Sequence, residues 1–92
     1  MKTSASEQVG AWLCGLPPQT KHRVLLALRG LAKGDGDIKG LQGPLEGFNR
    51  LRIGGQRIIH RQISGNEIQL EYANTRDVIY EIYEQILENK KR

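Results

Sequence analysis

The feature that most constrains the fold is a glycine pair at residues 54–55, which separates two runs of alternating apolar and polar side chains. These runs span residues 48–53 and 56–63. Glycine reaches positive φ angles without a steric cost, so the pair predicts a two-residue β-hairpin turn. A further turn at residues 64–66 and a third alternating run at residues 67–73 extend the hairpin. The sequence therefore predicts an antiparallel meander in the middle of the chain.

The segment before the meander has the apolar spacing of helices. Apolar residues recur at i, i+3, i+4 and i+7 over residues 9–16, and a second apolar stripe covers residues 24–32. Pro17-Pro18 lies between them, and the residue before a proline is disfavoured in the α region. Ser4 and Glu7 have the spacing of a capping box. These features predict a helical hairpin whose first helix begins at Ser4.

The segment after the meander is also predicted to be a helix. Residues 79–87 carry an apolar stripe, and Asn74 or Thr75 could cap that helix. A short strand at residues 1–4 could add a fourth strand to the sheet. The predicted fold is α+β, with an N-terminal helical hairpin, a small antiparallel meander sheet of three to four strands and a C-terminal helix. Residues 1–92 are expected to form a single domain.

The composition narrows the functional classes. The longest apolar run, residues 24–28, is too short to cross a bilayer, and residues 1–6 lack the apolar region of a secretory signal. Cys14 is the single cysteine, so an internal disulfide and a cysteine metal cluster are excluded. His22 and His60 are far apart in the chain and form no evident ligand pair. We expect a cytoplasmic protein without a metal or another cofactor.

The charge is concentrated in the meander. The chain has 14 basic and 10 acidic residues, a net charge of +4 and a pI of about 9.5. Between Gly47 and Asn66 there is no acidic residue, and the basic residues there are all arginines, which suit bidentate phosphate contacts. This pattern predicts a nucleic acid or an acidic protein as partner, although a solvated basic strand would look the same. The arginines of this stretch are Arg50, Arg52, Arg57 and Arg61.

The two-residue period of strands predicts which of these side chains meet. Arg50 and Arg52 share one face of their strand, and the tight hairpin can bring Arg57 beside them. On the C-terminal helix, Arg76 and Tyr80 are neighbours at i and i+4. We expect a basic surface with one phenol beside it.

Several short segments together resemble the RelE/ParE toxin superfamily. Lys-Gly-Leu at residues 39–41, Gly-Phe-Asn-Arg-Leu-Arg-Ile-Gly at 47–54 and Gln-Arg-Ile-Ile at 56–59 follow the family's order and spacing. Residues 76–80 look like the family's Arg-x-Asp-Val-Tyr end. The resemblance covers essentially the whole chain and is most specific over residues 39–60. It also implies the predicted fold.

The resemblance implies that the chain is the toxin of a type II toxin–antitoxin pair. RelE-like members cut messenger RNA on the ribosome, whereas ParE-like members inhibit DNA gyrase and cut nothing. The arginine-rich strands look closer to the RelE-like branch, which favours a ribosome-dependent endoribonuclease (mRNA interferase) that inhibits translation. The implied partners are a cognate antitoxin, the ribosome and mRNA, with no membrane. A ParE-like gyrase inhibitor and a non-catalytic member that only binds an antitoxin or another acidic partner remain as alternatives.

The resemblance also implies roles for individual residues. In RNA cleavage of this type the 2′-OH attacks its own 3′-phosphate, so no metal is required. Arg57 and Arg76 would hold the scissile phosphate, and Tyr80 would be the acid–base phenol. Arg52 and Arg50 would occupy the positions of basic residues on the family's first central strand, Arg52 in the catalytic group and Arg50 as a phosphate contact.

Some positions depart from the family pattern. RelE has lysines on the first central strand, and the arginines found here are poor general bases because they stay protonated. His60 stands where a second tyrosine is expected; it could act as a base or contact phosphate, or be an ordinary sheet residue. Arg61 could contact phosphate or be a solvated charge. Ile79 looks inserted, which makes Tyr83 an alternative to Tyr80 as the phenol.

Overall fold

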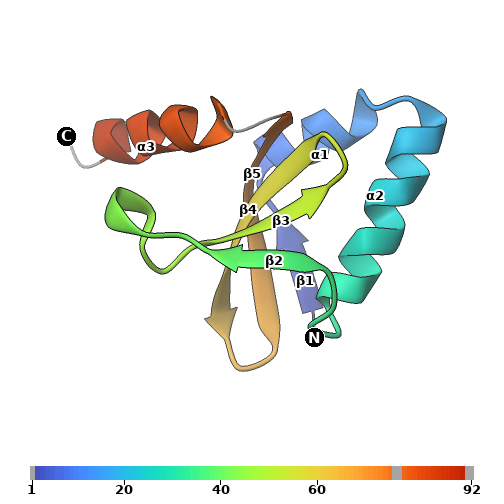
Figure 1. Cartoon of the computed structure of the whole chain (residues 1–92), viewed down its shortest axis with the longest axis horizontal. Helices are drawn as coiled ribbons and strands as arrows, with labels where there is room; N and C mark the ends of the chain where they lie inside the picture. Colours follow the sequence, from blue (N-terminus) through green and yellow to red (C-terminus); the bar gives the residue numbers. More distant parts are fainter. Residues whose placement is uncertain (1, 76–77, 91–92) are drawn as a thin grey trace.

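The fold is a five-stranded sheet with helices on both of its faces (Figure 1). It is described by a computed structural model that covers residues 2–75 and 78–90. In chain order, the elements are β1 (Lys2–Ala5), α1 (Glu7–Cys14), α2 (Pro18–Leu31), β2 (Asp37–Gly40), the short 3₁₀ helix η1 (Gly43–Leu45), β3 (Asn49–Ile53), β4 (Gln56–Ser64), β5 (Glu67–Thr75) and α3 (Val78–Lys90).

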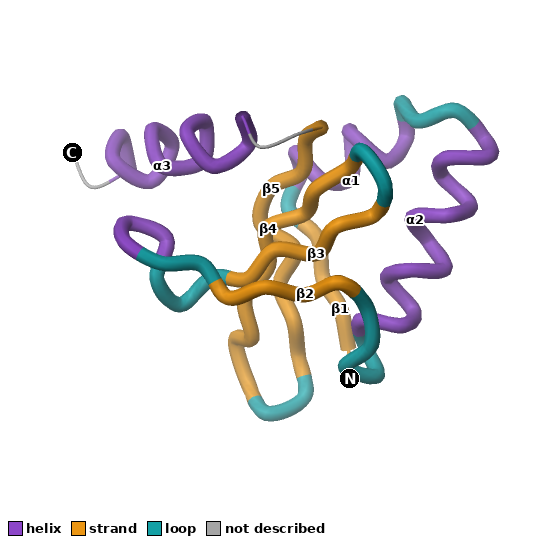
Figure 2. Tube along the Cα trace, in the orientation of Figure 1, coloured by secondary structure: helices purple, strands orange, loops and turns teal. Residues whose placement is uncertain are grey.

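The sheet is larger and more mixed than the sequence predicted. Its strand order is β1-β5-β4-β3-β2, with β3, β4 and β5 forming the predicted meander (Figure 2). The expectation of three to four antiparallel strands is wrong in two respects. β2 adds an edge strand beside β3, and β1 pairs with β5 in a parallel direction. The element order therefore begins with a strand, and a second strand separates the helical hairpin from the meander.

The start of the first helix differs from the prediction because Ser4 belongs to β1. The Ser4 hydroxyl donates to the side chains of Glu67 and Gln69 across the parallel pair, at 3.0 and 2.6 Å. Ser6 caps α1 instead, with its Oγ accepting a 3.3 Å hydrogen bond from the Val9 backbone N–H. The capping box at Ser4 is therefore wrong, since its serine is already used in the sheet.

The helical hairpin itself is confirmed. It breaks at Pro17, which has extended backbone angles, and Pro18 occupies the first turn of α2, where a missing N–H costs no helical hydrogen bond. The C-terminal helix is also present. Asn74 and Thr75 belong to β5 and α3 is described from Val78, so the predicted capping of this helix depends on positions outside the described residues.

A β-bulge in β5 changes which side chains share a face. Ile59 pairs with Tyr72, but the next residue of β4, His60, pairs with Leu70, so Glu71 is an extra residue. Strict alternation along the predicted strand at residues 67–73 would place Tyr72 on the same face as Leu70. This is wrong, because the bulge moves Tyr72 to the α3 side of the sheet while Leu70 stays on the α1 and α2 side.

Two apolar clusters lie on opposite faces of the sheet. The larger lies between the sheet and the helices α1 and α2, and the smaller lies between the sheet, η1 and α3. Within the described residues, no helix combines the length and the apolar character needed to cross a membrane. The buried members of the larger cluster include Val9, Val24, Leu51 and Ile58, and those of the smaller are Leu45, Ile59, Ile79 and Tyr83.

Candidate functional site

The meander places the arginines of β3 and β4 on the α3 side of the sheet. Arg50 pairs with Ile59, which belongs to the apolar cluster under α3, and Arg52 pairs directly with Arg57. Cross-strand partners project from the same face, so these arginines lie on the face that α3 covers in part. The predicted convergence of Arg50, Arg52 and Arg57 is confirmed at the level of strand register. We call Arg50, Arg52, Arg57 and Arg61 the arginine face.

Arg50 is held by the new edge strand. Its Nη2 lies 3.2 Å from Oδ1 of Asp37 in β2, and its side chain is only 11% exposed. Lys39 is its direct partner across β2 and β3, which places a further positive charge on this face. The ion pair offsets one charge of the arginine face and fixes the Arg50 guanidinium near β2.

Arg61 is held by the bulge in β5. Its Nε donates a 3.0 Å hydrogen bond to Oε1 of Glu71, and its guanidinium lies 5.7 Å from the centre of the Phe48 ring. Both contacts fix the direction of the guanidinium. Arg61 is therefore a half-exposed charge on the sheet that also forms an ion pair.

Arg52 and Arg57 form the central pair of the arginine face. Nη1 of Arg57 donates to the carbonyl oxygens of Gly54 and Gln56 at 2.9 and 3.2 Å, which turns the side chain toward the hairpin turn. Arg52 is exposed, and within the described part of the chain it makes no hydrogen bond or ion pair. Arg52 is thus an accessible cation beside a guanidinium that the hairpin backbone positions.

The two tyrosines of α3 have different surroundings. Tyr83 is 2% exposed and its hydroxyl donates a 3.0 Å hydrogen bond to Oε2 of Glu71. Burial, followed by the charge and hydrogen bond of Glu71, raises the pKa of Tyr83 well above its usual value, with Arg61 opposing. Tyr80 is half-buried and packs against the apolar cluster under α3. Of the two phenols, Tyr80 is the one that is open to solvent in part.

His60 lies on the opposite face of the sheet from the arginine face. It pairs with Asn49 and Leu70, on the side that the helical hairpin covers, and it is 4% exposed. Burial lowers the pKa of His60 to about 4, so the imidazole is neutral at pH 7. The structure does not bring His60 together with Arg57 or Tyr80.

Arg76, the remaining predicted site residue, lies outside the described residues. The sequence reasoning missed the two carboxylates of this site, Asp37 and Glu71, because Asp37 comes from a strand that was not predicted and Glu71 is the extra residue of a bulge that was not predicted. Among residues 2–75 and 78–90, no group of three or more His, Cys, Asp or Glu side chains is arranged to hold a metal ion.

No protein-family model matches the sequence, and no curated protein matches it either. Solved structures do match. A chain of the RelB–RelE antitoxin–toxin complex from Methanococcus jannaschii superposes with a TM-score of 0.66 at 20% identity, over 86% of this chain and 96% of that chain. The chain has the RelE/ParE toxin fold. The resemblance read from the sequence is confirmed at the level of the fold.

Further structures support the RelE/ParE fold. A YoeB/ParE toxin from Agrobacterium tumefaciens superposes with a TM-score of 0.65 at 18% identity, over 82% of this chain and 98% of that chain. The YoeB–YefM complex from Staphylococcus aureus gives a TM-score of 0.65 at 16% identity, over 80% and 94% of the two chains. The arginine face therefore lies on the central strands of a RelE/ParE fold that covers most of the chain.

Proposed function

We propose that this chain is the toxin of a type II toxin–antitoxin pair and acts as a ribosome-dependent mRNA endoribonuclease. The observation that carries the proposal is the cross-strand pair of Arg52 and Arg57 at the centre of a RelE/ParE fold. Two guanidiniums that face one surface repel each other, and an anion placed between them would relieve that repulsion. An RNA phosphate has the charge and the oxygen acceptors for this position.

The chemistry requires positioning and charge stabilisation more than a special nucleophile. The RNA 2′-oxygen forms a bond to phosphorus while the bond from phosphorus to the 5′-oxygen breaks, which leaves a 2′,3′-cyclic phosphate and a 5′-hydroxyl. Negative charge grows on the phosphate oxygens in the transition state, and fixed cations stabilise it. In this proposal Arg57, together with Arg76, holds the scissile phosphate, and Arg52 stabilises the growing charge.

Proton transfer is assigned to Tyr80. The 2′-hydroxyl must lose a proton and the departing 5′-oxygen must gain one. The Tyr83 hydroxyl is already committed to Glu71 and is buried, which makes it a poor acid or base. His60 is separated from the arginine face by the sheet. Tyr80 is therefore the phenol that we propose for acid–base catalysis, with Arg50 and Arg61 as flanking RNA contacts.

The proposed partners follow from the same surface. The RelB–RelE and YoeB–YefM structures that match this chain are complexes of two proteins, and the first is named as an antitoxin–toxin complex. We propose a cognate antitoxin for this chain, the ribosome and mRNA as its targets, and the cytoplasm as its location. An acidic antitoxin segment would compete with RNA for Arg52 and Arg57.

A non-catalytic binding role is the second candidate, and the ion pairs favour it. Asp37 and Glu71 offset the charges of Arg50 and Arg61, so the protein itself neutralises these two members of the arginine face. An acidic partner segment would then find its accessible cation at Arg52. Inhibition of DNA gyrase, as in ParE-like proteins, is a third outcome that the test below can distinguish.

The test is controlled expression of the full chain in a bacterium, with primer extension on a defined messenger at induction. Parallel cultures express Arg57→Ala, Arg52→Ala and Tyr80→Phe. Arg29→Ala is the matched control, because Arg29 is an exposed arginine on α2, which covers the opposite face of the sheet. Far-UV circular dichroism of each purified variant shows whether it folds.

We expect growth arrest with codon-phased cuts for the wild type and for Arg29→Ala. The cuts should be lost in Arg57→Ala and Tyr80→Phe and weakened in Arg52→Ala. Arrest without RNA cuts but with gyrase-dependent DNA breaks would contradict the RNase proposal and select gyrase. Growth without arrest would select the non-catalytic binding role.

A further inference from the structure

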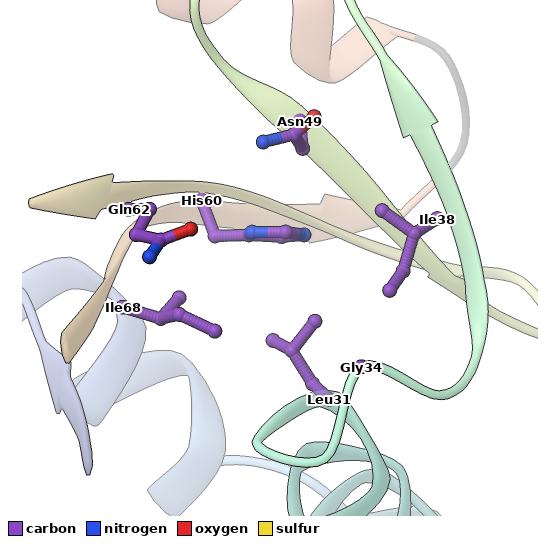
Figure 3. A pocket seen from close by; sticks show the side chains of 7 residues that line it. All are labelled: Leu31, Gly34, Ile38, Asn49, His60, Gln62 and Ile68. Atoms are coloured by element: carbon purple, nitrogen blue, oxygen red, sulfur yellow. The ribbon is translucent and has the colours of Figure 1, made fainter. Parts of the chain in front are cut away.

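One face of α2 packs against the sheet, and Arg23 lies outside that face. Val24 and Leu31 of α2 are buried in the larger apolar cluster. Figure 3 shows Leu31 pointing toward His60 and Ile68 of the sheet, where a small pocket lies between the helix and the strands. Arg23 is exposed, and within the described residues it makes no hydrogen bond or ion pair. It is therefore a cation that the packing of α2 leaves available.

Arg23 reaches the hairpin turn that also positions Arg57. A Cβ placed on Gly54 would lie 3.6 Å from Nη1 of Arg23, and the carbonyl oxygen of Gly54 accepts the 2.9 Å hydrogen bond from Nη1 of Arg57. Both guanidiniums therefore lie against the same glycine. Arg52 is the direct cross-strand partner of Arg57. We call Arg23, Arg52 and Arg57 the turn cluster.

The two chain segments that meet at this turn carry no negative charge. Residues 8–34, which include α2, and residues 48–65, which include β3 and β4, contain no aspartate or glutamate. The ion pairs described above neutralise Arg50 and Arg61, which lie elsewhere on the arginine face. Like charges held around one turn repel each other, so an anionic ligand would lower the energy of the turn cluster.

The positions of the three arginines match successive phosphates of one RNA strand better than a single phosphate. Under the proposed function, the scissile phosphate is held between Arg52 and Arg57 on the sheet. Arg23 approaches the turn from α2, on the other side of the sheet, so it is placed beside the path of the strand and not at the same phosphate. Phosphate contacts of this kind fix the register of a nucleic acid without reading its bases.

We propose that Arg23 binds the phosphate next to the scissile one, so that the RNA strand leaves the arginine face over the β3–β4 turn. The proposal rests on the proposed binding of RNA to Arg52 and Arg57. Arg23 is a binding residue in this arrangement, because it does not touch the reacting atoms. It extends the RNA surface from the sheet to the helical hairpin.

The test is the salt dependence of binding between the full-length protein and a 2′-O-methyl RNA oligonucleotide, measured by filter binding. This RNA keeps its phosphates and lacks the 2′-hydroxyl nucleophile, so it is bound without being cut. Each phosphate contact to a single strand contributes about 0.7 to the slope of log affinity against log salt. We expect the slope to become shallower by about 0.7 in Arg23→Ala and by about 1.4 in the double variant with Arg52→Ala.

Two further variants separate a direct contact from a change in net charge. Arg29→Ala removes the same charge from another exposed position on α2, and its slope should equal that of the wild type. Arg23→Lys keeps the charge and should keep the wild-type slope. Far-UV circular dichroism of each variant confirms that it folds, which we expect because both arginines are exposed.

The outcomes distinguish this contact from the proposed cleavage. Equal slopes for Arg23→Ala and Arg29→Ala would overturn the inference and leave the RNase proposal standing. A wild type that does not bind the RNA would overturn both. A shallower slope in Arg23→Ala, combined with no RNA cuts by the wild type in the expression test, would support the contact at Arg23 and contradict the RNase proposal alone.

Discussion

Tyr83 in α3 donates a 3.0 Å hydrogen bond to one carboxylate oxygen of Glu71, while Arg61 in β4 donates to the other oxygen at the same distance. Glu71 is the extra residue of the β-bulge, so one carboxylate joins the bulge to α3 and to the neighbouring strand. The phenol of Tyr83 also contacts the rings of Phe48 and Tyr72, with centroids 5.4 and 5.8 Å away. This arrangement makes Tyr83 a structural residue.

Tyr83→Phe should therefore lower stability without abolishing RNA cleavage. The substitution removes a hydrogen bond to a charged, mostly buried carboxylate, so we expect the free energy of unfolding to fall by about 1–2 kcal/mol. Tyr80→Phe should do the reverse, with unchanged stability and lost cleavage. Urea denaturation and primer extension measure the two quantities. Loss of cleavage in Tyr83→Phe with native-like stability would instead identify Tyr83 as the acid–base phenol.

Alanine substitutions of Arg50 and Arg52 should also differ in their effect on stability. Arg52→Ala removes an exposed side chain, so the free energy of unfolding should change by less than about 0.5 kcal/mol. Arg50→Ala removes a mostly buried side chain and its ion pair with Asp37, and should cost about 1 kcal/mol.

Binding to a single-stranded RNA should weaken in Arg52→Ala, and the salt dependence of binding should become shallower by about 0.7 per lost phosphate contact. Filter binding over a salt series measures this slope, with Arg29→Ala as the control for net charge. An unchanged slope in Arg52→Ala would show that this guanidinium does not meet the RNA backbone.

The sequence predicts the local parts of this fold well. Apolar spacing and the proline pair indicate the helical hairpin, and the glycine pair at 54–55 indicates the hairpin of β3 and β4, because these signals act between neighbouring residues. The strand β2 was missed, and β1 was predicted only as a possible fourth strand, for the opposite reason. β1 has no alternating pattern and gains its order from Glu67 and Gln69, more than 60 positions away in the chain. All four residues of β2 are exposed, so no buried face marks it as a strand.

The candidate site was also predicted where local signals determine it and missed where it depends on other parts of the fold. The two-residue period places Arg50, Arg52 and Arg57 on one face, as the register confirms. It cannot show that Asp37 and Glu71 neutralise Arg50 and Arg61, since these pairs depend on an unpredicted strand and an unpredicted bulge. A bulge leaves no clear trace in composition, so a prediction that assumes strict alternation assigns the wrong face beyond it.

His60 predicts a pH dependence of stability. Its pKa is about 4 in the folded protein, against about 6.5 in an unfolded chain. Between these values the unfolded state binds more protons, so stability rises with pH across this window and is lost as the pH falls from 6.5 toward 4. The loss due to His60 should be at most about 3 kcal/mol. Urea denaturation of the wild type and of His60→Phe from pH 4 to 7.5 isolates it, because the carboxylates titrate alike in both. Parallel pH profiles would contradict the burial of a neutral imidazole.

The hairpin turn offers a test of backbone conformation with its control one residue away. Gly54 has φ +58°, in the left-handed region that costs a side chain about 1–2 kcal/mol, whereas Gly55 has no positive φ and open space where a Cβ would lie. Gly54→Ala should therefore lower the free energy of unfolding by about 1 kcal/mol, and Gly55→Ala should leave it unchanged or raise it by reducing the freedom of the unfolded chain. Arg57 donates to the Gly54 carbonyl, so a strained turn would also displace this guanidinium and reduce RNA cleavage in Gly54→Ala more than in Gly55→Ala. Equal effects of the two substitutions on urea denaturation would show that the turn does not hold Gly54 in this conformation.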